Sequence, residues 1–113
     1  MEITSRAELE PFTTKDGSTI RELMHTDRQS LAEATLAPGQ ATERHYHRLA
    51  EELYSFTAGG GVLEVDGEEC IVRAGDTVLI PAGAWHTFVA GAEGGTLLCC
   101  CVPPYSHDDT YFE

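Results

Sequence analysis

Short runs of alternating apolar and polar residues, separated by turn residues, extend along most of the chain. Strands are predicted at residues 20–24, 53–57, 62–65, 68–73, 77–80 and 85–89, and glycine-rich loops at residues 58–61 and 91–95. Asp66-Gly67, between two of these strands, is a strong signal for a two-residue hairpin. Short strands at this spacing, with glycine and proline between them, are typical of an all-β sandwich or barrel.

A continuous apolar run at residues 97–102 contains three of the four cysteines. We predict a buried strand in which Cys99 and Cys101 share one face and Cys100 points the opposite way. Consecutive cysteines are poorly placed to bridge separate parts of a fold, so we interpret them as reduced thiols that fill space in the core. One of the two faces could instead look into an internal cavity, where a sulfur near a metal would be open to oxidation.

Two separate segments carry histidines in a pattern that suits a metal ion. His45 and His47 are two residues apart, so in a strand their side chains share a face, about 6.6 Å apart along the chain. The acidic pair Glu51-Glu52 follows shortly after, and His86 ends a second, glycine-rich segment. Three imidazoles and one carboxylate suit iron, manganese, nickel, cobalt, copper or zinc. We therefore predict one divalent transition metal ion, without assigning its identity.

These segments resemble the two motifs of the cupin superfamily. The first motif, with its glycine, His-x-His, glutamate and second glycine, is matched by Gly39, His45, His47, Glu52 and Gly59. The second motif is matched by Gly75, Pro81, Gly83 and His86, whereas Ala90 stands where the motif has asparagine. Since that asparagine is not a metal ligand in the family, the departure leaves the ligand set unchanged.

The resemblance implies both the ligand set and the fold. The metal ligands would be His45, His47, Glu52 and His86. Glu51 also fits the spacing after the histidines, but only Glu52 lies six residues before a glycine. The implied fold is all-β, a double-stranded β-helix or jelly-roll barrel. On this ground residues 30–36 are predicted as a strand, although their alanine, leucine and glutamate content also fits a helix.

The chain of 113 residues has room for one domain with its own core. The resemblance divides this single cupin domain, residues 1–113, into an N-terminal arm at 1–18, a barrel core at 35–103 that carries both motifs, and a C-terminal tail at 104–113. Cupins often pair through N-terminal strands, so the resemblance also implies a homodimer formed through residues 2–12.

Charge narrows the class of partner. The chain has 7 basic and 19 acidic residues and a net charge of -12, which would repel a phosphate backbone or an anionic membrane surface. We therefore expect neither nucleic acid nor membrane as a partner. No N-terminal segment has the basic and then apolar residues of a signal peptide. No apolar run approaches the roughly 20 residues that a membrane helix needs. These observations favour a cytoplasmic protein.

Two further side chains are candidates for catalysis. If Glu52 points inward, Tyr54 and Phe56 do so as well, and aromatic walls around one ion suit a small organic molecule. Tyr54 is the better candidate because its hydroxyl needs a partner when buried, although packing alone also explains an inward aromatic. His107 could carry protons at the mouth of the barrel with Asp108, or could lie on a surface tail.

Three functions remain open at this point. With iron, four protein ligands leave about two positions of an octahedron open for dioxygen and a chelating substrate. Small cupins of this pattern include such enzymes, so the resemblance implies a dioxygenase that acts on a small organic molecule. A redox-silent metal would favour an isomerase, dehydratase or lyase through Lewis-acid chemistry. The third hypothesis is a non-catalytic module that binds or senses a small molecule.

Overall fold

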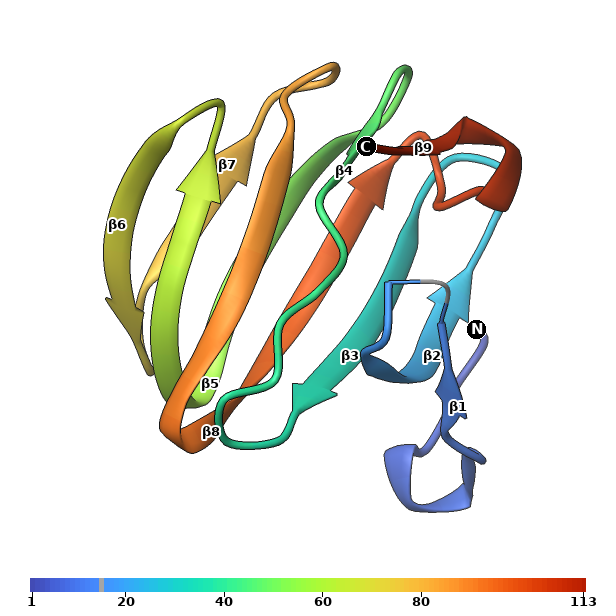
Figure 1. Cartoon of the computed structure of the whole chain (residues 1–113). Coiled ribbons are helices and arrows are strands. Elements are labelled where there is room, and N and C mark those ends of the chain that lie inside the picture. The colour runs from blue at the N-terminus through green and yellow to red at the C-terminus, as the bar shows by residue number, and fades with distance from the viewer. Residues whose placement is uncertain (15) are drawn as a thin grey trace.

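The computed structural model describes residues 1–14 and 16–113. Its elements, in chain order, are η1 (Arg6–Glu8), β1 (Phe12–Thr13), β2 (Thr19–His25), β3 (Ser30–Leu36), β4 (His45–His47), β5 (Glu51–Val65), β6 (Glu68–Arg73), β7 (Thr77–Ile80), β8 (His86–Val102), η2 (His107–Asp109) and β9 (Thr110–Phe112). The strands form one antiparallel sheet that curls around an interior, as Figure 1 shows. The predicted all-β architecture, a sheet curled into a jelly-roll barrel, is confirmed, and so is the strand at residues 30–36.

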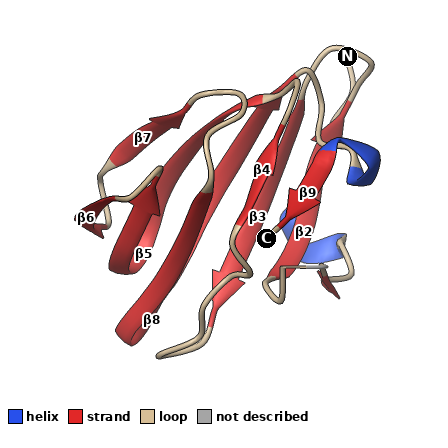
Figure 2. Cartoon of the chain, turned by 45° about the horizontal axis from the view of Figure 1, so that its top comes forward, coloured by secondary structure: helices blue, strands red, loops and turns tan. Residues whose placement is uncertain are grey.

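The two long strands β5 and β8 organise the molecule. They pair from Glu51 opposite Val102 to Val65 opposite His86, and the remaining strands attach to their flanks. β6 and β7 pair with β5, while β3 pairs with the second half of β8 (Figure 2). β4 meets the start of β8 and also pairs with β9. His45 and His47 on β4 are thereby brought beside the first residue of β8.

The two predicted glycine-rich loops are wrong, because both segments lie within continuous strands. β5 runs through residues 58–61 and β8 through residues 91–95, with register shifts where the strands bend. A Cβ atom on Gly61 would overlap the backbone carbonyl of Val89, and one on Gly59 would overlap that of Gly94. The glycines therefore permit two backbones to approach closely at a bend, and do not mark a loop.

The interior has two parts. In the first, which we call the packed half, β5, β6 and β7 enclose Leu63, Val72 and Ile80, each at most 2% exposed. The predicted hairpin closes its edge, with Val65 paired to Glu68 and positive φ angles at the two turn residues. In the second, the cavity half, the inner faces of β2, β3, β4, β9, the start of β5 and both ends of β8 surround an open space.

The two ends of the chain differ in how they join the sheet. Residues 1–8 are exposed, and β1 pairs with β2 at the sheet edge. The last ten residues, expected as a tail, contain η2 and the strand β9, which pairs with β4 (Figure 1). Among the described residues, no helix has the length and apolar character needed to cross a lipid bilayer.

Candidate metal centre

The histidine pair lies on β4 as the alternation of side chains predicts. His45 and His47 point inward and are 3% and 4% exposed. Tyr46, between them, faces outward, where its ring stacks on Tyr111 with a centroid distance of 5.1 Å and meets Trp85 at 4.7 Å. These outer aromatic contacts hold the short strand in place from one side, so that both imidazoles are presented on the other side.

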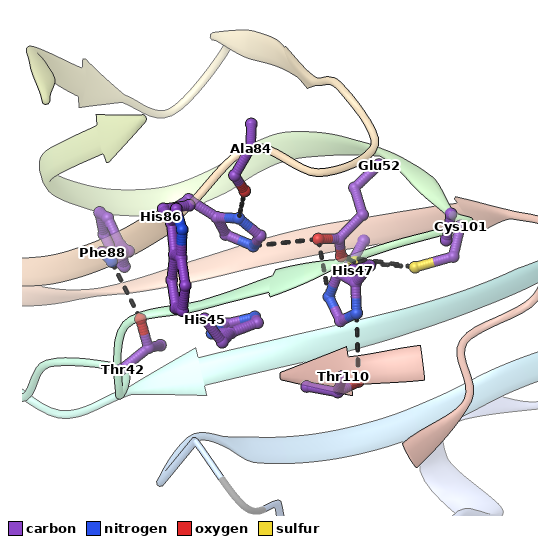
Figure 3. A network of polar contacts seen from close by, with 12 residues as sticks. Thr42, His45, His47, Glu52, Ala84, His86, Phe88, Cys101 and Thr110 are labelled. Carbon is purple, nitrogen blue, oxygen red and sulfur yellow. Dashed lines mark hydrogen bonds and ion pairs between the residues drawn. The ribbon is translucent and has the colours of Figure 1, made fainter. Parts of the chain in front are cut away.

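Glu52 and His86 complete a buried cluster with the two histidines of β4. Glu52 lies at the start of β5, and His86 begins β8 directly opposite His45 in the register. One potential ligand atom from each of the four residues lies within 4.8 Å of the others. Figure 3 shows Glu52, His47 and His86 converging on one point. The neighbouring Glu51 is exposed, so the structure places the second glutamate in the cluster.

Each imidazole is oriented by a hydrogen bond at Nδ1. The His45 Nδ1 lies 2.7 Å from the carbonyl oxygen of Glu43, and the His86 Nδ1 lies 2.9 Å from that of Ala84. A carbonyl oxygen only accepts, so Nδ1 carries the proton in both rings and Nε2 keeps its lone pair in the neutral form. These are the bonds that metal-binding histidines typically make outside the site.

His47 is oriented through a side chain from the far end of the chain. Its Nδ1 lies 3.1 Å from Thr110 Oγ1, and that hydroxyl donates its proton to the carbonyl oxygen of Ser106 at 2.9 Å. The hydroxyl is therefore left as an acceptor for the Nδ1 proton of His47. The threonine fixes the tautomer of His47, so all three histidines can present Nε2 to the centre.

The buried acceptor atoms of the cluster fit a cation. Glu52 Oε1 lies 3.0 Å from Nε2 of both His47 and His86. Glu52 Oε1 and His86 Nε2 are buried and lack a hydrogen-bond partner among the described residues. Neutral imidazoles bring lone pairs and no proton to this point, so the atoms would repel one another without a positive charge between them. A divalent transition metal held by three nitrogens and one oxygen would supply that charge.

The pKa values show how strongly the groups interact. Burial acts to lower the pKa of His47, but hydrogen bonding to Glu52 and the charge of Glu52 outweigh it and the pKa is raised. Burial and the nearby positive charge of His86 lower the pKa of His45. Burial opposes ionisation of Glu52, yet its interaction with His47 and His86, which attract the carboxylate when their Nε2 atoms are protonated, holds its pKa well below the ordinary value. Glu52 is thus a carboxylate, and a proton on His47 Nε2 competes with a metal.

The second oxygen of Glu52 is held by two thiols. Cys99 Sγ donates to Glu52 Oε2 at 2.9 Å and Cys101 Sγ does so at 3.4 Å (the Cys101 contact is drawn in Figure 3). The hydrogen bond with Cys101 and burial raise the pKa of the Cys99 thiol well above its usual value. The predicted alternation is confirmed, because Cys99 and Cys101 line the cavity half.

A second residue of the C-terminal segment shapes the turn between the ligands. The buried carboxylate of Asp109 accepts hydrogen bonds from the backbone N–H groups of Leu49 at 2.9 Å and Ala50 at 3.1 Å. This turn separates His47 from Glu52, so Asp109 sets their spacing. Sequence analysis missed both Asp109 and Thr110. The one local signal was the alternation in Thr110-Tyr-Phe112, which is typical of a short strand.

The cluster lies on the wall of a cavity that is partly open to solvent. Its lining is largely apolar and includes Leu36, Phe88 and Leu97, with Asp16 among the polar exceptions. The Oδ1 of Asp16 accepts hydrogen bonds from the Ser18 backbone N–H at 2.9 Å and hydroxyl at 2.6 Å. A pocket of this kind suits a small organic molecule.

The two candidate catalytic residues are placed differently. Tyr54 lines the cavity, and its ring meets that of His86 edge to face at a centroid distance of 5.8 Å. Burial, followed by the negative charge of Glu52, raises its pKa well above the usual value, so the hydroxyl stays protonated. His107 is exposed on η2 and is not among the described residues that line the cavity.

Comparisons with known proteins agree with this fold. A sequence profile described as the cupin domain matches residues 32–102. An uncharacterized protein from Methanocaldococcus jannaschii is 42% identical over 113 residues, which covers 95% of this chain and 90% of that protein. Gentisate 1,2 dioxygenase 1 of Aquipseudomonas alcaligenes is 33% identical over 58 residues, 51% of this chain and 17% of the dioxygenase.

Two further comparisons widen the chemistry of the relatives. Dimethylsulfoniopropionate lyase DddW of Ruegeria pomeroyi is 38% identical over 61 residues, 54% of this chain and 40% of the lyase. Among solved structures, that of a single-residue variant of Streptomyces Pac13, a nucleoside dehydratase, with uridine has a TM-score of 0.86 and 15% identity, over 100% of this chain and 90% of that chain. At 15% identity, this similarity supports the fold alone.

Proposed function

This chain belongs to the cupin family, and from that premise we propose that it is a metal-dependent enzyme that acts on a small organic molecule held in the cavity half. One observation carries the proposal. The buried acceptor atoms of His45, His47, Glu52 and His86 meet at one point on the cavity wall, where a cation both satisfies them and is open to a substrate.

The residues of the chain have distinct parts in this proposal. The three Nε2 atoms and Glu52 Oε1 would hold the ion, and a bound divalent transition metal would supply a Lewis acid or, as iron, a centre for dioxygen chemistry. The apolar walls of the cavity exclude water from the carbon skeleton of the substrate. Tyr54, kept neutral by burial, can donate a hydrogen bond to an oxygen of the substrate.

Within this class we favour a dioxygenase. Four protein ligands leave about two positions of an octahedral ion for dioxygen and a chelating substrate. The similarity to part of a gentisate dioxygenase supports this choice. The test is oxygen consumption by the iron-loaded chain with a panel of small catechols, hydroxylated aromatic acids and diketones. We expect uptake that depends on both iron and substrate, and uptake by Glu52→Gln equal to wild type would contradict the proposal.

The second candidate is elimination at a redox-silent metal, and the position of Tyr54 favours it. A hydroxyl that stays protonated beside the centre can protonate a leaving group as a C–O or C–S bond breaks. The similarity to part of a dimethylsulfoniopropionate lyase agrees with this chemistry. Turnover by the zinc-loaded chain without oxygen would select this candidate over the dioxygenase. In that case Tyr54→Phe should lower kcat more than it raises KM.

A binding or sensing module is the outcome that would replace both enzymatic candidates. It predicts tight binding of a small molecule to the metal-loaded chain and no product under either atmosphere. Isothermal titration with the same substrate panel, followed by mass spectrometry of the mixture, separates binding from turnover.

We further propose that the chain forms a homodimer through residues 2–12. This segment is largely exposed and contains Ile3 at 79% and Phe12 at 50% exposure. Multi-angle light scattering should give twice the chain mass for the full chain, and the chain mass after removal of residues 1–10. A monomeric full chain would contradict the proposal.

A further inference from the structure

Two cysteines and the metal-site glutamate form a second group of potential ligands beside the first. Cys99 Sγ and Cys101 Sγ lie 3.7 Å apart on the same face of β8. Both sulfurs contact Glu52 Oε2, the carboxylate oxygen that faces away from the histidines. All three potential ligand atoms lie within 4.8 Å of one another, and Cys101 and Glu52 are buried. The four-residue cluster uses the other oxygen, Oε1, at 3.0 Å from two imidazoles.

The spacing of these atoms matches that around a four-coordinate ion. Two sulfurs at about 2.3 Å from one ion and at a tetrahedral angle are about 3.8 Å apart, and a sulfur and a carboxylate oxygen are about 3.5 Å apart. The observed separations are 3.7 Å between the sulfurs and 3.4 Å from Cys101 Sγ to Glu52 Oε2. The remaining pair, Cys99 Sγ and Oε2, is closer at 2.9 Å and would have to open slightly.

We propose that Cys99, Cys101 and Glu52 form a second cation site, selective for soft ions with filled d shells such as zinc, cadmium or copper(I). Glu52 bridges the two sites, with Oε1 on the histidine side and Oε2 on the sulfur side. Thiolates select such ions, whereas the histidine site with its mixed nitrogen and oxygen ligands accepts a wider range of metals. The sulfur site does not depend on the proposed enzymatic function.

Proton and charge balance are consistent with this second site. Each thiol forms one sulfur–metal bond and releases its proton to water through the cavity, and no atom changes oxidation state. Glu52 and two thiolates together carry three negative charges, and two divalent cations carry four positive charges. The doubly loaded centre therefore differs from neutrality by a single charge, as a largely buried site requires.

The chain offers its own control for the sulfur ligands. Cys100 lies between the two proposed ligands but points to the opposite face of β8, and Cys70 is exposed on β6. Replacing both, as Cys70→Ser with Cys100→Ser, leaves the proposed pair as the remaining thiols of the chain. The experiment starts from this reduced variant under nitrogen, because cadmium bound to thiolates has a distinct ultraviolet charge-transfer absorption.

Stepwise addition of cadmium to this variant should give two bound ions per chain and the thiolate absorption. Adding Cys99→Ser and Cys101→Ser should reduce the stoichiometry to one ion and abolish the absorption, while circular dichroism confirms the fold. A single bound ion without thiolate absorption in the starting variant would overturn the proposal. So would an unchanged absorption in the protein that lacks all four cysteines.

A histidine variant separates this inference from the proposed function. In the same background, His86→Ala should weaken the histidine site but retain one cadmium ion with thiolate absorption. Failure of the histidine site to bind any metal would therefore leave this result intact. Loss of the thiolate absorption in His86→Ala would show that the sulfurs belong to a single mixed site, and it would refute a separate one.

Discussion

The packed half and the cavity half are built on the same two long strands, yet they place opposite kinds of side chain inside. In the packed half the inward positions hold Leu63, Val72 and Ile80, which contact one another and need no polar partner. In the cavity half the inward positions of β4, β5 and β8 hold three imidazoles and a carboxylate. Strand alternation therefore determines which residues face inward in both halves. Polar residues at these positions also need hydrogen bonds, and distant segments of the chain supply them.

The largest expected effect is on the packed half. Leu63→Ala should lower the free energy of unfolding of the metal-free protein by about 2–5 kcal/mol, because Leu63 is 1% exposed and its loss leaves a cavity. Urea denaturation measures this loss. Metal affinity of the folded variant should remain within about twofold of wild type. A large loss of metal affinity with an unchanged free energy of unfolding would contradict the separate roles of the packed half and the cavity half.

The next largest effect is on the cavity half. His86→Ala should reduce metal affinity more than about 100-fold, which exceeds the range for partners outside the ligand shell, and should leave the protein folded. Competition with a chromophoric chelator measures the affinity. The matched control is His25→Ala, which removes an exposed histidine that lies 3.5 Å from Glu22. Equal affinity in the two variants would contradict the ligand assignment.

A smaller effect should follow from loss of the hydrogen bond that joins the C-terminal strand β9 to His47 on β4. Thr110→Val removes the acceptor for the Nδ1 proton of His47 and should lower metal affinity about 10- to 100-fold. Thr110→Ser retains the hydroxyl and should restore most of the affinity. If valine and serine variants lose affinity equally, Thr110 acts through packing and not through its hydrogen bond.

The smallest effect is a dependence on pH. The pKa of His47 is raised, so its proton competes with the metal already above pH 6.5, the ordinary histidine value. Apparent affinity should therefore fall as pH falls through this range, by up to about tenfold per unit for one competing proton. The stability of the metal-free protein should depend on pH in the opposite direction. Because the fold stabilises the protonated form of His47, the free energy of unfolding should fall as pH rises. Measured affinities that do not change between pH 8 and 6 would refute this competition.

The four residues of the cluster could be predicted partly from local geometry and partly from a resemblance. His45 and His47 share a face in any strand, whereas Glu52 and His86 were assigned from the spacing of the two cupin motifs. The inward positions of Tyr54 and Cys99 followed from the same alternation. For the residues placed by alternation, the prediction needed only a strand and the side on which one of its residues faces.

What could not be predicted depends on contacts between distant segments. Asp109 and Thr110 contact residues that lie 59 to 63 positions earlier, and no local pattern indicates such a partner. The loop predicted at residues 58–61 is wrong because glycine is favoured both in turns and where two backbones approach closely. What distinguishes the two cases here is the backbone carbonyl of Val89 on the neighbouring strand, which leaves no room for a side chain on Gly61.

The most direct test of the central claim is a crystal structure of the metal-loaded protein with an anomalous difference map at the absorption edge of the metal. Our account predicts a peak about 2.0–2.2 Å from Nε2 of His45, His47 and His86 and from Glu52 Oε1. Density at the surface alone, or a peak that lacks any one of the three imidazoles as a ligand, would contradict the proposal that these four side chains bind one ion.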